Sequence, residues 1–441
     1  MSVSQQHLEI VPSNITSNGK LSYKNGQPTI QLLIGAQERS IVPGSVRLCG
    51  KITVFKTPGN IPVKADGIRM NEKLGVYSII DTLSINSQRT SQTIETINHH
   101  NRMMSSYLSV TQSQGDFACH AYETALRFPN YEAMKRGVVD NTQSTASPAN
   151  SFCIPLVSGL FLGQDPIPLS DQWGVGGLSI EIQLAPDQQV LFSEDNSDAN
   201  LVDAFYELSD VRLICEVQRP APDELSRLMS QTTNVFNYNS ISSYFNTINS
   251  ANAILNFNLG LKSVLGCFMN IVPSSHINNF TRDGLATLPF TNLDGTIATI
   301  EQAVFTRSGE RVPLEYNIDT IQKSPGEAGN ETADPQIIRN YMDAVMDFAK
   351  INRSSVDSAN YRNVDAGTNF ADSKIIPKGG SMWGLGVNYD GISNSGLDMS
   401  QTPFGVQLQL GLTSDHPNAI FLFVHSRQTV VSSGGSIQIM K

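Results

Sequence analysis

Alternation of hydrophobic and polar residues is the dominant pattern along this chain of 441 residues. In the segment 178–184, four aliphatic side chains alternate with Ser, Glu and Gln, so the aliphatic residues share one face of a strand. Strands with one apolar and one polar face are typical of antiparallel sheets, whereas strands of parallel sheets are apolar almost throughout. The pattern therefore predicts antiparallel β-structure.

One strand pattern occurs twice in the sequence. The segment from Gly177 to Asp187 and the segment from Gly405 to Asp415 share their pattern and lie about half the chain apart. A chain of this length exceeds the roughly 250–300 residues that one hydrophobic core can organise. The repeat therefore favours two similar β-domains, although a single barrel with a large insertion remains an alternative.

A proline-containing stretch, "QRPAPDELSRL" at 218–228, marks the best boundary between the two halves. Proline ends the preceding strand because it has no N–H to donate to a ladder. We therefore predict a first domain at 1–218, a linker at 219–240 and a second domain at 241–441.

Several other segments have the composition of strands. They are 29–34, 46–55, 76–85, 210–218, 253–261, 263–272 and 419–426. The segment 302–316 predicts a hairpin, with Ser308 and Gly309 at its turn.

Two helices are predicted between the strands. The first, within 94–108, places five side chains on one face at steps of three and four: Ile94, Ile97, Asn101, Met104 and Leu108. The second covers 335–351, with Asp334 as the N-cap and Pro335 at the first helical position. Its expected apolar face consists of Ile338, Tyr341, Val345 and Phe348.

Composition narrows the possible functions. Only 16% of the residues are charged, against about 25% in typical soluble domains, and the net charge is −10. An acidic chain without clustered Lys and Arg is unsuited to coating nucleic acid, so we expect no specific nucleic-acid binding. We also expect neither a signal peptide nor a transmembrane segment, because no apolar run is long enough.

The five cysteines are odd in number and widely spaced, which argues against a disulfide framework. Several lie in apolar strand segments, where a free thiol acts as a small hydrophobe, so folding in a reducing compartment is expected. The four glycosylation sequons, at Asn14, Asn279, Asn330 and Asn352, are interpreted as chance matches.

Candidate metal sites are weak. Glu95 and His99 are four residues apart on the first predicted helix, with His100 beside them, but no further ligands are indicated. We therefore expect a polar helix face there. The acidic segment 193–203 could bind divalent ions opportunistically, but its spacing does not match a calcium-binding loop.

Candidate catalytic and ligand-binding residues are equally sparse. The neighbours Cys119 and His120 would point to opposite faces of a strand, and no third group orients them. Trp173 and Trp383 could each stack on a sugar, but more often such residues cap a sandwich core. We therefore predict no catalytic residue, no metal, no cofactor and no enzymatic activity.

Two parts of the first half carry a family resemblance. The segments 168–192 and 205–220, "PLSDQWGVGGLSIEIQLAPDQQVLF" and "FYELSDVRLICEVQRP", resemble the closing part of the first barrel in double jelly-roll major capsid proteins of virophages and polinton-like viruses. Tyr206, Leu208, Val211 and Leu213 occupy the positions of the family's Y-x-L-x-x-V-x-L pattern. The segment 75–102 is similar to a strand with the inserted helix, and 384–431 to the end of the second barrel.

The resemblance implies an all-β fold of two tandem eight-stranded antiparallel jelly-roll barrels with a few inserted helices and long loops. It also implies a structural capsid protein that forms a homotrimer with a pseudo-hexameric outline and tiles the icosahedral shell of a double-stranded DNA virus. A vertex penton protein and minor capsid proteins are the other implied partners. The implied location is the virion, with assembly in the host cytoplasm or nucleus. We expect the loops 125–151 and 281–300 and the helix 337–351 to take part in assembly contacts.

Two other functions stay open at this point. A carbohydrate- or receptor-binding β-sandwich protein, such as a viral spike or lectin-like module, would use Trp173 or Trp383 without forming shells. A secreted hydrolase on a β scaffold would need an export signal and paired catalytic carboxylates, and neither is apparent in the sequence.

Overall fold

The chain is described here by a computed structural model. The described residues are 5–15, 19–24, 26–56, 61–62, 70–71, 74–111, 125–126, 151–192, 204–280, 284–285, 300–312, 318–319, 335–351, 384–389, 396–410 and 417–441.

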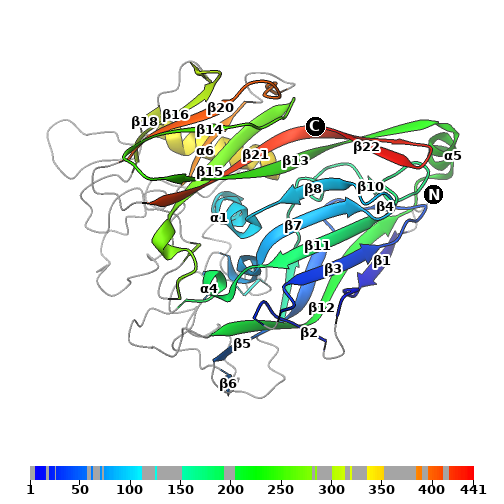
Figure 1. Cartoon of the computed structure of the whole chain (residues 1–441). Coiled ribbons are helices and arrows are strands. Elements are labelled where there is room, and N and C mark those ends of the chain that lie inside the picture. The colour runs from blue at the N-terminus through cyan, green and yellow to red at the C-terminus, as the bar shows by residue number, and fades with distance from the viewer. Residues whose placement is uncertain are drawn as a thin grey trace.

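The first half of the chain forms two antiparallel sheets (Figure 1). One sheet has the order β3 (Thr29–Ile34), β11 (Leu178–Leu184), β7 (Ile80–Ser87) and β8 (Thr93–Ile97). The other has the order β1 (Gln5–Ile10), β12 (Phe205–Gln218), β5 (Arg47–Lys56) and β9 (Ser151–Pro155). The short strands β2 (Lys20–Leu21), β4 (Ser40–Ile41), β6 (Ile61–Pro62) and β10 (Ile167–Pro168) extend this second sheet.

The second half also forms two antiparallel sheets. One has the order β14 (Asn252–Phe257), β20 (Phe404–Leu410), β16 (Ile300–Arg307) and β17 (Glu310–Arg311), with β18 (Ile318–Asp319) beside β16. The other has the order β13 (Thr233–Ile248), β21 (Asn418–Ser433), β15 (Val264–Pro273) and β19 (Leu385–Asn388), with β22 (Ser436–Met440) beside β21.

The two halves are topological copies of each other. Strands β1, β3, β5, β7, β8, β9, β11 and β12 have the same chain order and the same neighbours as β13, β14, β15, β16, β17, β19, β20 and β21. Eight antiparallel strands in two sheets of this order make a jelly roll. The predicted double jelly roll is therefore confirmed, and the repeated strand is explained: β11 and β20 occupy the same position in their sheets.

The helices fall at equivalent positions too. Helix α1 (His100–Thr111) lies between β8 and β9 in the chain, and α6 (Pro335–Ala349) lies between β17 and β19. Helix α5 (Pro222–Ser230) connects the two halves and contains no buried residue. The short α4 (Asp187–Val190) and the 3-10 turns η1 (Gly75–Ile79) and η5 (Ser274–His276) complete the described helices.

The alternation of apolar and polar residues predicted strands correctly where one face of the strand is exposed. Strand β3 matches its predicted limits, and the inward residues Leu178, Ile180, Ile182 and Leu184 of β11 are buried as predicted. The hairpin turn is also confirmed, because Ser308 and Gly309 both have the positive φ that a type I′ turn requires. Its expected end, beyond Val312, lies outside the described residues.

Several predicted boundaries were wrong. The strand predicted at 253–261 ends at Phe257, and the strand predicted at 210–218 begins at Phe205. The segment 76–79 forms η1 rather than a strand, and all of η1 is buried, so no polar face exists for a strand to expose. The predicted helix 94–108 begins only at His100, because Thr93–Ile97 pairs with β7 as strand β8. Nor is α1 two-faced: His100–Ser106 is buried all round, since the helix lies between the two barrels.

The second predicted helix is confirmed. Helix α6 begins at Pro335, and its expected apolar face of Ile338, Tyr341, Val345 and Phe348 is buried. Its expected N-cap, Asp334, lies outside the described residues.

The buried hydrophobic residues of both halves form one continuous cluster, so the barrels share an apolar boundary instead of being separated by water. The proposed limits 1–218, 219–240 and 241–441 stay a prediction; β13 already begins at Thr233, inside the proposed linker. In the part of the chain that the structure describes, no helix has the length and apolarity needed to cross a bilayer.

The two-faced strands give a direct test of the fold. We expect Ile182→Ala in β11 and Leu408→Ala in β20 each to lower the free energy of unfolding by about 2–5 kcal/mol, because each leaves a cavity in its own barrel. The outward neighbours provide controls: Gln183→Ala and Gln407→Ala should change it by no more than about 0.5 kcal/mol. Urea unfolding checks this, and equal losses for inward and outward positions would contradict the assignment.

Candidate functional site

The most elaborate arrangement of polar groups lies at the seam between the barrels, where edge strand β8 of the first barrel contacts edge strand β13 of the second. An edge strand presents unpaired N–H and C=O groups, which are costly to bury. No backbone ladder joins β8 to β13 among the described strands. Side chains therefore have to satisfy these groups.

Glu95 of β8 is the central side chain of the seam. It is 2% exposed, and its carboxylate accepts hydrogen bonds from the backbone N–H groups of Gly159 (3.1 Å), Leu160 (3.0 Å) and Ile241 (2.7 Å). Gly159 and Leu160 belong to the first barrel and Ile241 to β13. Burial raises the pKa of Glu95, and the hydrogen bonds to its oxygens oppose that rise. This one carboxylate thus joins the two barrels.

Other hydrogen bonds cross the seam beside Glu95. The hydroxyl of Tyr238 donates to the carbonyl of Ile94 at 2.7 Å, and the N–H of Asn98 donates to Ser243 Oγ at 2.8 Å. The approach is close: a Cβ placed on Gly159 would lie 2.2 Å from the carbonyl oxygen of Asn239. Only glycine fits at this contact between barrels.

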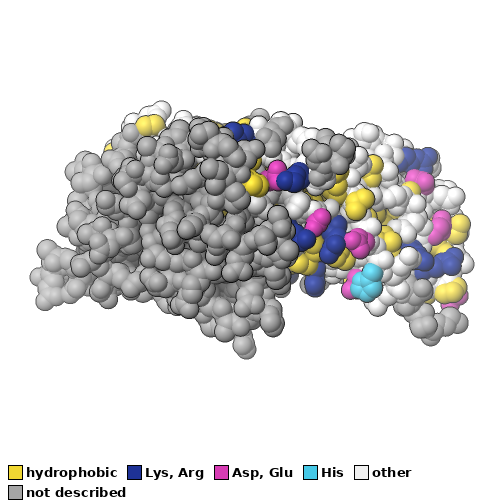
Figure 2. All heavy atoms as spheres, turned by 90° about the horizontal axis from the view of Figure 1, so that it is seen from below, with side chains coloured by type: hydrophobic (Ala, Val, Ile, Leu, Met, Phe, Trp, Pro, Cys, Tyr) yellow, Lys and Arg dark blue, Asp and Glu magenta, His cyan; other side chains and the backbone are white. Residues whose placement is uncertain are grey.

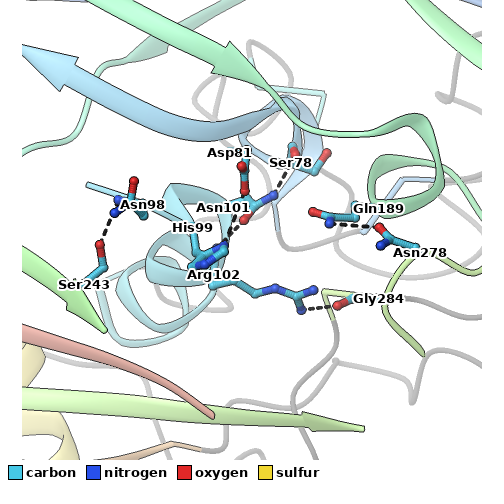
Figure 3. A network of polar contacts seen from close by, with 10 residues as sticks. All are labelled: Ser78, Asp81, Asn98, His99, Asn101, Arg102, Gln189, Ser243, Asn278 and Gly284. Atoms are coloured by element: carbon cyan, nitrogen blue, oxygen red, sulfur yellow. Dashed lines mark hydrogen bonds and ion pairs between the residues drawn. The ribbon is translucent and has the colours of Figure 1, made fainter. Parts of the chain in front are cut away.

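Helix α1 extends the seam toward the second barrel (Figure 3). The Arg102 guanidinium, 2% exposed, donates to the carbonyl of Gly284 and lies 4.9 Å from the ring centroid of Phe421. Asn270 of β15 donates to the backbone carbonyl of Arg102 at 2.9 Å. A buried cation is therefore held by a carbonyl and an aromatic face of the opposite barrel.

Helix α6 closes the seam from the second barrel. Its Phe348 makes an edge contact with Tyr107 of α1, with ring centroids 6.1 Å apart. On its inner side, Asp347 Oδ2 lies 3.0 Å from Nε2 of the fully buried His425 on β21. The two equivalent helices thus touch each other, and α6 is also fixed to its own barrel.

The structure separates the residues of the weak metal candidate. Glu95 lies on a strand and faces backbone N–H groups, whereas His99 lies 3.5 Å from Asp81 and packs edge-on against Phe421. His100 is buried, with Nε2 2.8 Å from the carbonyl oxygen of Val157. The expected polar helix face was therefore wrong. Among the described residues, no three metal-binding side chains come together.

Burial of His100 has an electrostatic consequence. Loss of hydration lowers the pKa of its imidazole to about 4, although the Val157 carbonyl and Asp81 act in the opposite direction. The ring is therefore neutral at neutral pH, at the first residue of α1, where a positive charge would be unfavourable.

Trp173 is 3% exposed and lines a cavity of about 240 Å³ between α5 and the ends of both barrels. Its ring is not available to stack on a sugar from solvent. It lies outside the continuous hydrophobic cluster, so its expected role as the cap of a core stays a prediction. Trp383, the pair Cys119 and His120, and the acidic segment 193–203 lie outside the described residues, as does most of the loops 125–151 and 281–300.

The outer face of the β1-β12-β5-β9 sheet, on the side seen in Figure 2, carries charges of both signs among neutral polar and apolar side chains. Three ion pairs join neighbouring strands there: Lys20 with the half-buried Glu207, Lys51 with Asp210, and Arg212 with Glu9. Such pairs contribute about 0–1 kcal/mol each. Among the described residues of this face, charges of opposite sign are therefore intermixed rather than concentrated.

Comparisons with known proteins support the fold. No protein-family model matches the chain, and no curated protein matches it. Among solved structures, a chain of the PBCV-1 virus capsid is similar with a TM-score of 0.54 and 10% identity over 100% of this chain and 97% of that one. The Faustovirus major capsid protein is similar with a TM-score of 0.53 and 9% identity, over 98% of this chain and 91% of that one. The mavirus major capsid protein is similar with a TM-score of 0.50 and 12% identity, over 98% of this chain and 90% of that one.

The chain therefore has the double jelly-roll fold, and it shares that fold over nearly its whole length with major capsid proteins of a virophage and of large viruses. The resemblance inferred from the sequence is confirmed at the level of the fold. The seam was not predicted, because nothing near Glu95 in the sequence distinguishes a buried carboxylate from an exposed one.

The role of Glu95 can be measured. Glu95→Ala should lower the free energy of unfolding by roughly 3–5 kcal/mol, because three backbone donors lose their acceptor inside the protein. Glu95→Gln should cost less, since an amide oxygen still accepts while the amide N–H₂ opposes one of the donors. The matched control is Glu181→Gln on the outer row of β11, which should be nearly neutral. Equal losses for Glu95→Gln and Glu181→Gln in urea unfolding would contradict this role.

His100 predicts an acid-dependent loss of stability. Its folded-state pKa of about 4 lies below the ordinary value of 6.5, so the unfolded chain takes up the proton first as the pH falls. The protein should therefore lose stability between pH 6.5 and pH 4, reaching about 3 kcal/mol from this group.

The measurement compares the pH dependence of urea unfolding for the wild type and His100→Gln. The slope in this window should be shallower for the variant. The contribution of Glu95 to the pH dependence of stability has the opposite sign, because its raised pKa makes the folded state the better proton acceptor. Glu95 is present in both proteins, so its contribution cancels in the comparison. An unchanged slope would show that His100 is not kept neutral by burial.

Proposed function

We propose that this chain is a structural major capsid protein. Three copies form a trimer with six barrels in a pseudo-hexagonal ring, and these capsomers tile the icosahedral shell of a double-stranded DNA virus. The observation that carries the proposal is the duplicated jelly roll, which matches capsid proteins over at least 98% of this chain.

The seam suggests how the ring closes. Within one chain, the β8 side of the first barrel meets the β13 side of the second. The topological equivalents of these strands are β17 and β1. A second copy of the same contact would therefore join the β17 side of one chain to the β1 side of the next. Contacts between unlike surfaces generate a closed ring when the rotation that relates successive subunits returns to the first one. Two barrels per chain and three chains then give six similar barrel junctions.

The surfaces required for this contact are exposed in the single chain. Both residues of β17 are exposed, and β1 is exposed or half-buried throughout. Val11, directly after β1, is 65% exposed. Helix α6 is the equivalent of α1, which fills the seam, so α6 is placed to contribute to the contact between chains, as expected for 337–351.

The remaining features fit assembly better than chemistry. The mixed charges and neutral polar groups of the outer sheet suit many weak contacts between capsomers, which allow misplaced units to dissociate. We place the protein in the virion, with assembly in the host cytoplasm or nucleus, and with a vertex penton protein and minor capsid proteins as further partners. We propose no enzymatic activity. Burial of Trp173 removes one of the two aromatic residues on which the glycan-binding alternative depended.

Native mass spectrometry of the purified protein tests the proposal. We expect a homotrimer of three 48.1 kDa chains and hexagonal particles in electron micrographs. Val11→Arg should weaken the trimer at least tenfold, because a long charged side chain replaces a small exposed apolar one at the proposed contact. The matched control is Met440→Arg on β22, which is also exposed but lies on neither proposed surface. A chain that stays monomeric at assembly concentrations would refute the proposed function, and equal effects of the two variants would refute the ring geometry.

A further inference from the structure

Two cysteines lie side by side on the outer face of the first barrel. Cys49 of β5 and Cys153 of β9 are directly opposite each other in the register of these antiparallel strands, and their Sγ atoms are 3.0 Å apart. Their neighbours two positions away along the strands, Lys51 and Ser151 among them, are exposed, so the pair belongs to the outward row. These two thiols are therefore not fillers of the hydrophobic core.

We propose that Cys49 and Cys153 are a redox-sensitive pair, which forms a disulfide when the protein meets a small disulfide such as oxidised glutathione. Opposite residues of antiparallel strands have Cα atoms about 4.5–5.5 Å apart. Disulfides need a Cα separation of about 4.4–6.8 Å, so the bond can form without displacement of either strand. The inference concerns a single chain and goes beyond the proposed capsid function.

The chemistry is an ordinary thiol–disulfide exchange. Cys153 is the more exposed thiol, so it loses its proton to solvent and attacks one sulfur of the small disulfide. This forms a mixed disulfide and releases one small thiol. The Cys49 sulfur then loses its proton, attacks Cys153 Sγ and expels the second small thiol. Two protein thiols are oxidised and one small disulfide is reduced to two thiols.

The surroundings of the pair make this reaction slow. The pKa of Cys49 is raised to about 12, mainly by burial and to a smaller extent by the neighbouring Cys153. Arg212 and Arg47 act against this rise. Only the thiolate reacts, so closure should be slow at neutral pH and faster in alkaline solution. The pair thus stays reduced during folding in a reducing compartment and closes after exposure to an oxidising medium.

The position of the bond gives it a structural effect. Within the described sheet, β9 pairs with β5 alone, and it begins directly after the segment 127–150. A bond between Cys49 and Cys153 would attach this edge strand covalently to the barrel. It would also close a loop of about 100 residues in the unfolded chain, a length at which a crosslink strongly restricts the unfolded state.

The experiment treats the full-length protein with oxidised glutathione under native conditions. Remaining thiols are then alkylated, and the peptides are mapped by mass spectrometry. We expect a peptide pair joined through Cys49 and Cys153 that dithiothreitol separates, an intact mass lower by about 2 Da, and a Tm higher on the order of 5 °C than that of the reduced protein. Closure should be at least several-fold faster at pH 9 than at pH 7.

Two variants complete the test. Cys153→Ser should abolish the joined peptides and the Tm difference, whereas Cys215→Ala, in the same sheet, should retain both. The proposal is overturned if both thiols of the folded wild type remain open to alkylation after oxidation. It is also overturned if oxidation yields only glutathione adducts, or a bond to another cysteine. Because the wild type alone decides these outcomes, a folding defect in a variant does not affect them.

Discussion

The structure depends on the hydrogen-bond requirement of two strand edges that meet inside the protein. Strand β8 and strand β13 bring unpaired backbone groups together without forming a ladder, and Glu95 supplies the missing acceptor for donors on both sides. A buried carboxylate is tolerated only while its donors surround it. The Glu95 side chain and the relative orientation of the barrels therefore depend on each other. The contact between α1 and α6 adds apolar area to this seam.

The two barrels have the same topology and different surroundings. The seam joins unlike edges, β8 of one copy and β13 of the other, so the equivalents β17 and β1 are left on the outside. Equivalent helices have also diverged. Helix α1 is buried between barrels and rich in serine, whereas α6 keeps an exposed face with Arg339 paired to Asp343. The two halves are thus not interchangeable, and one of their differences lies where one barrel contacts the other.

The sequence predicted those features that local pattern determines. Strands such as β3 and β11 were predicted because one face is more exposed to solvent and the other is buried. The turn at Ser308 was predicted because its residues tolerate positive φ. The residues 94–97 were misread because Ile94 and Ile97 fit either a helix face or a strand until the partner β7 is known. Glu95 and Arg102 were not recognised as structural, since burial of a charge depends on groups more than a hundred residues away. The pairing of Cys49 with Cys153 depends on register across a long insertion, which composition does not reveal.

The pairing of β1 with β12 has a consequence for synthesis of the protein. Strand β1 begins at Gln5 and its partner ends at Gln218, so the ribosome must release nearly the entire first half before that barrel can close. Once closed, this barrel still lacks β13, so the β8 edge remains uncovered and Glu95 has only its first-barrel donors until further translation supplies Ile241. Nascent chains therefore pass through a stage with an open strand edge, which is the kind of surface that chaperones protect from aggregation.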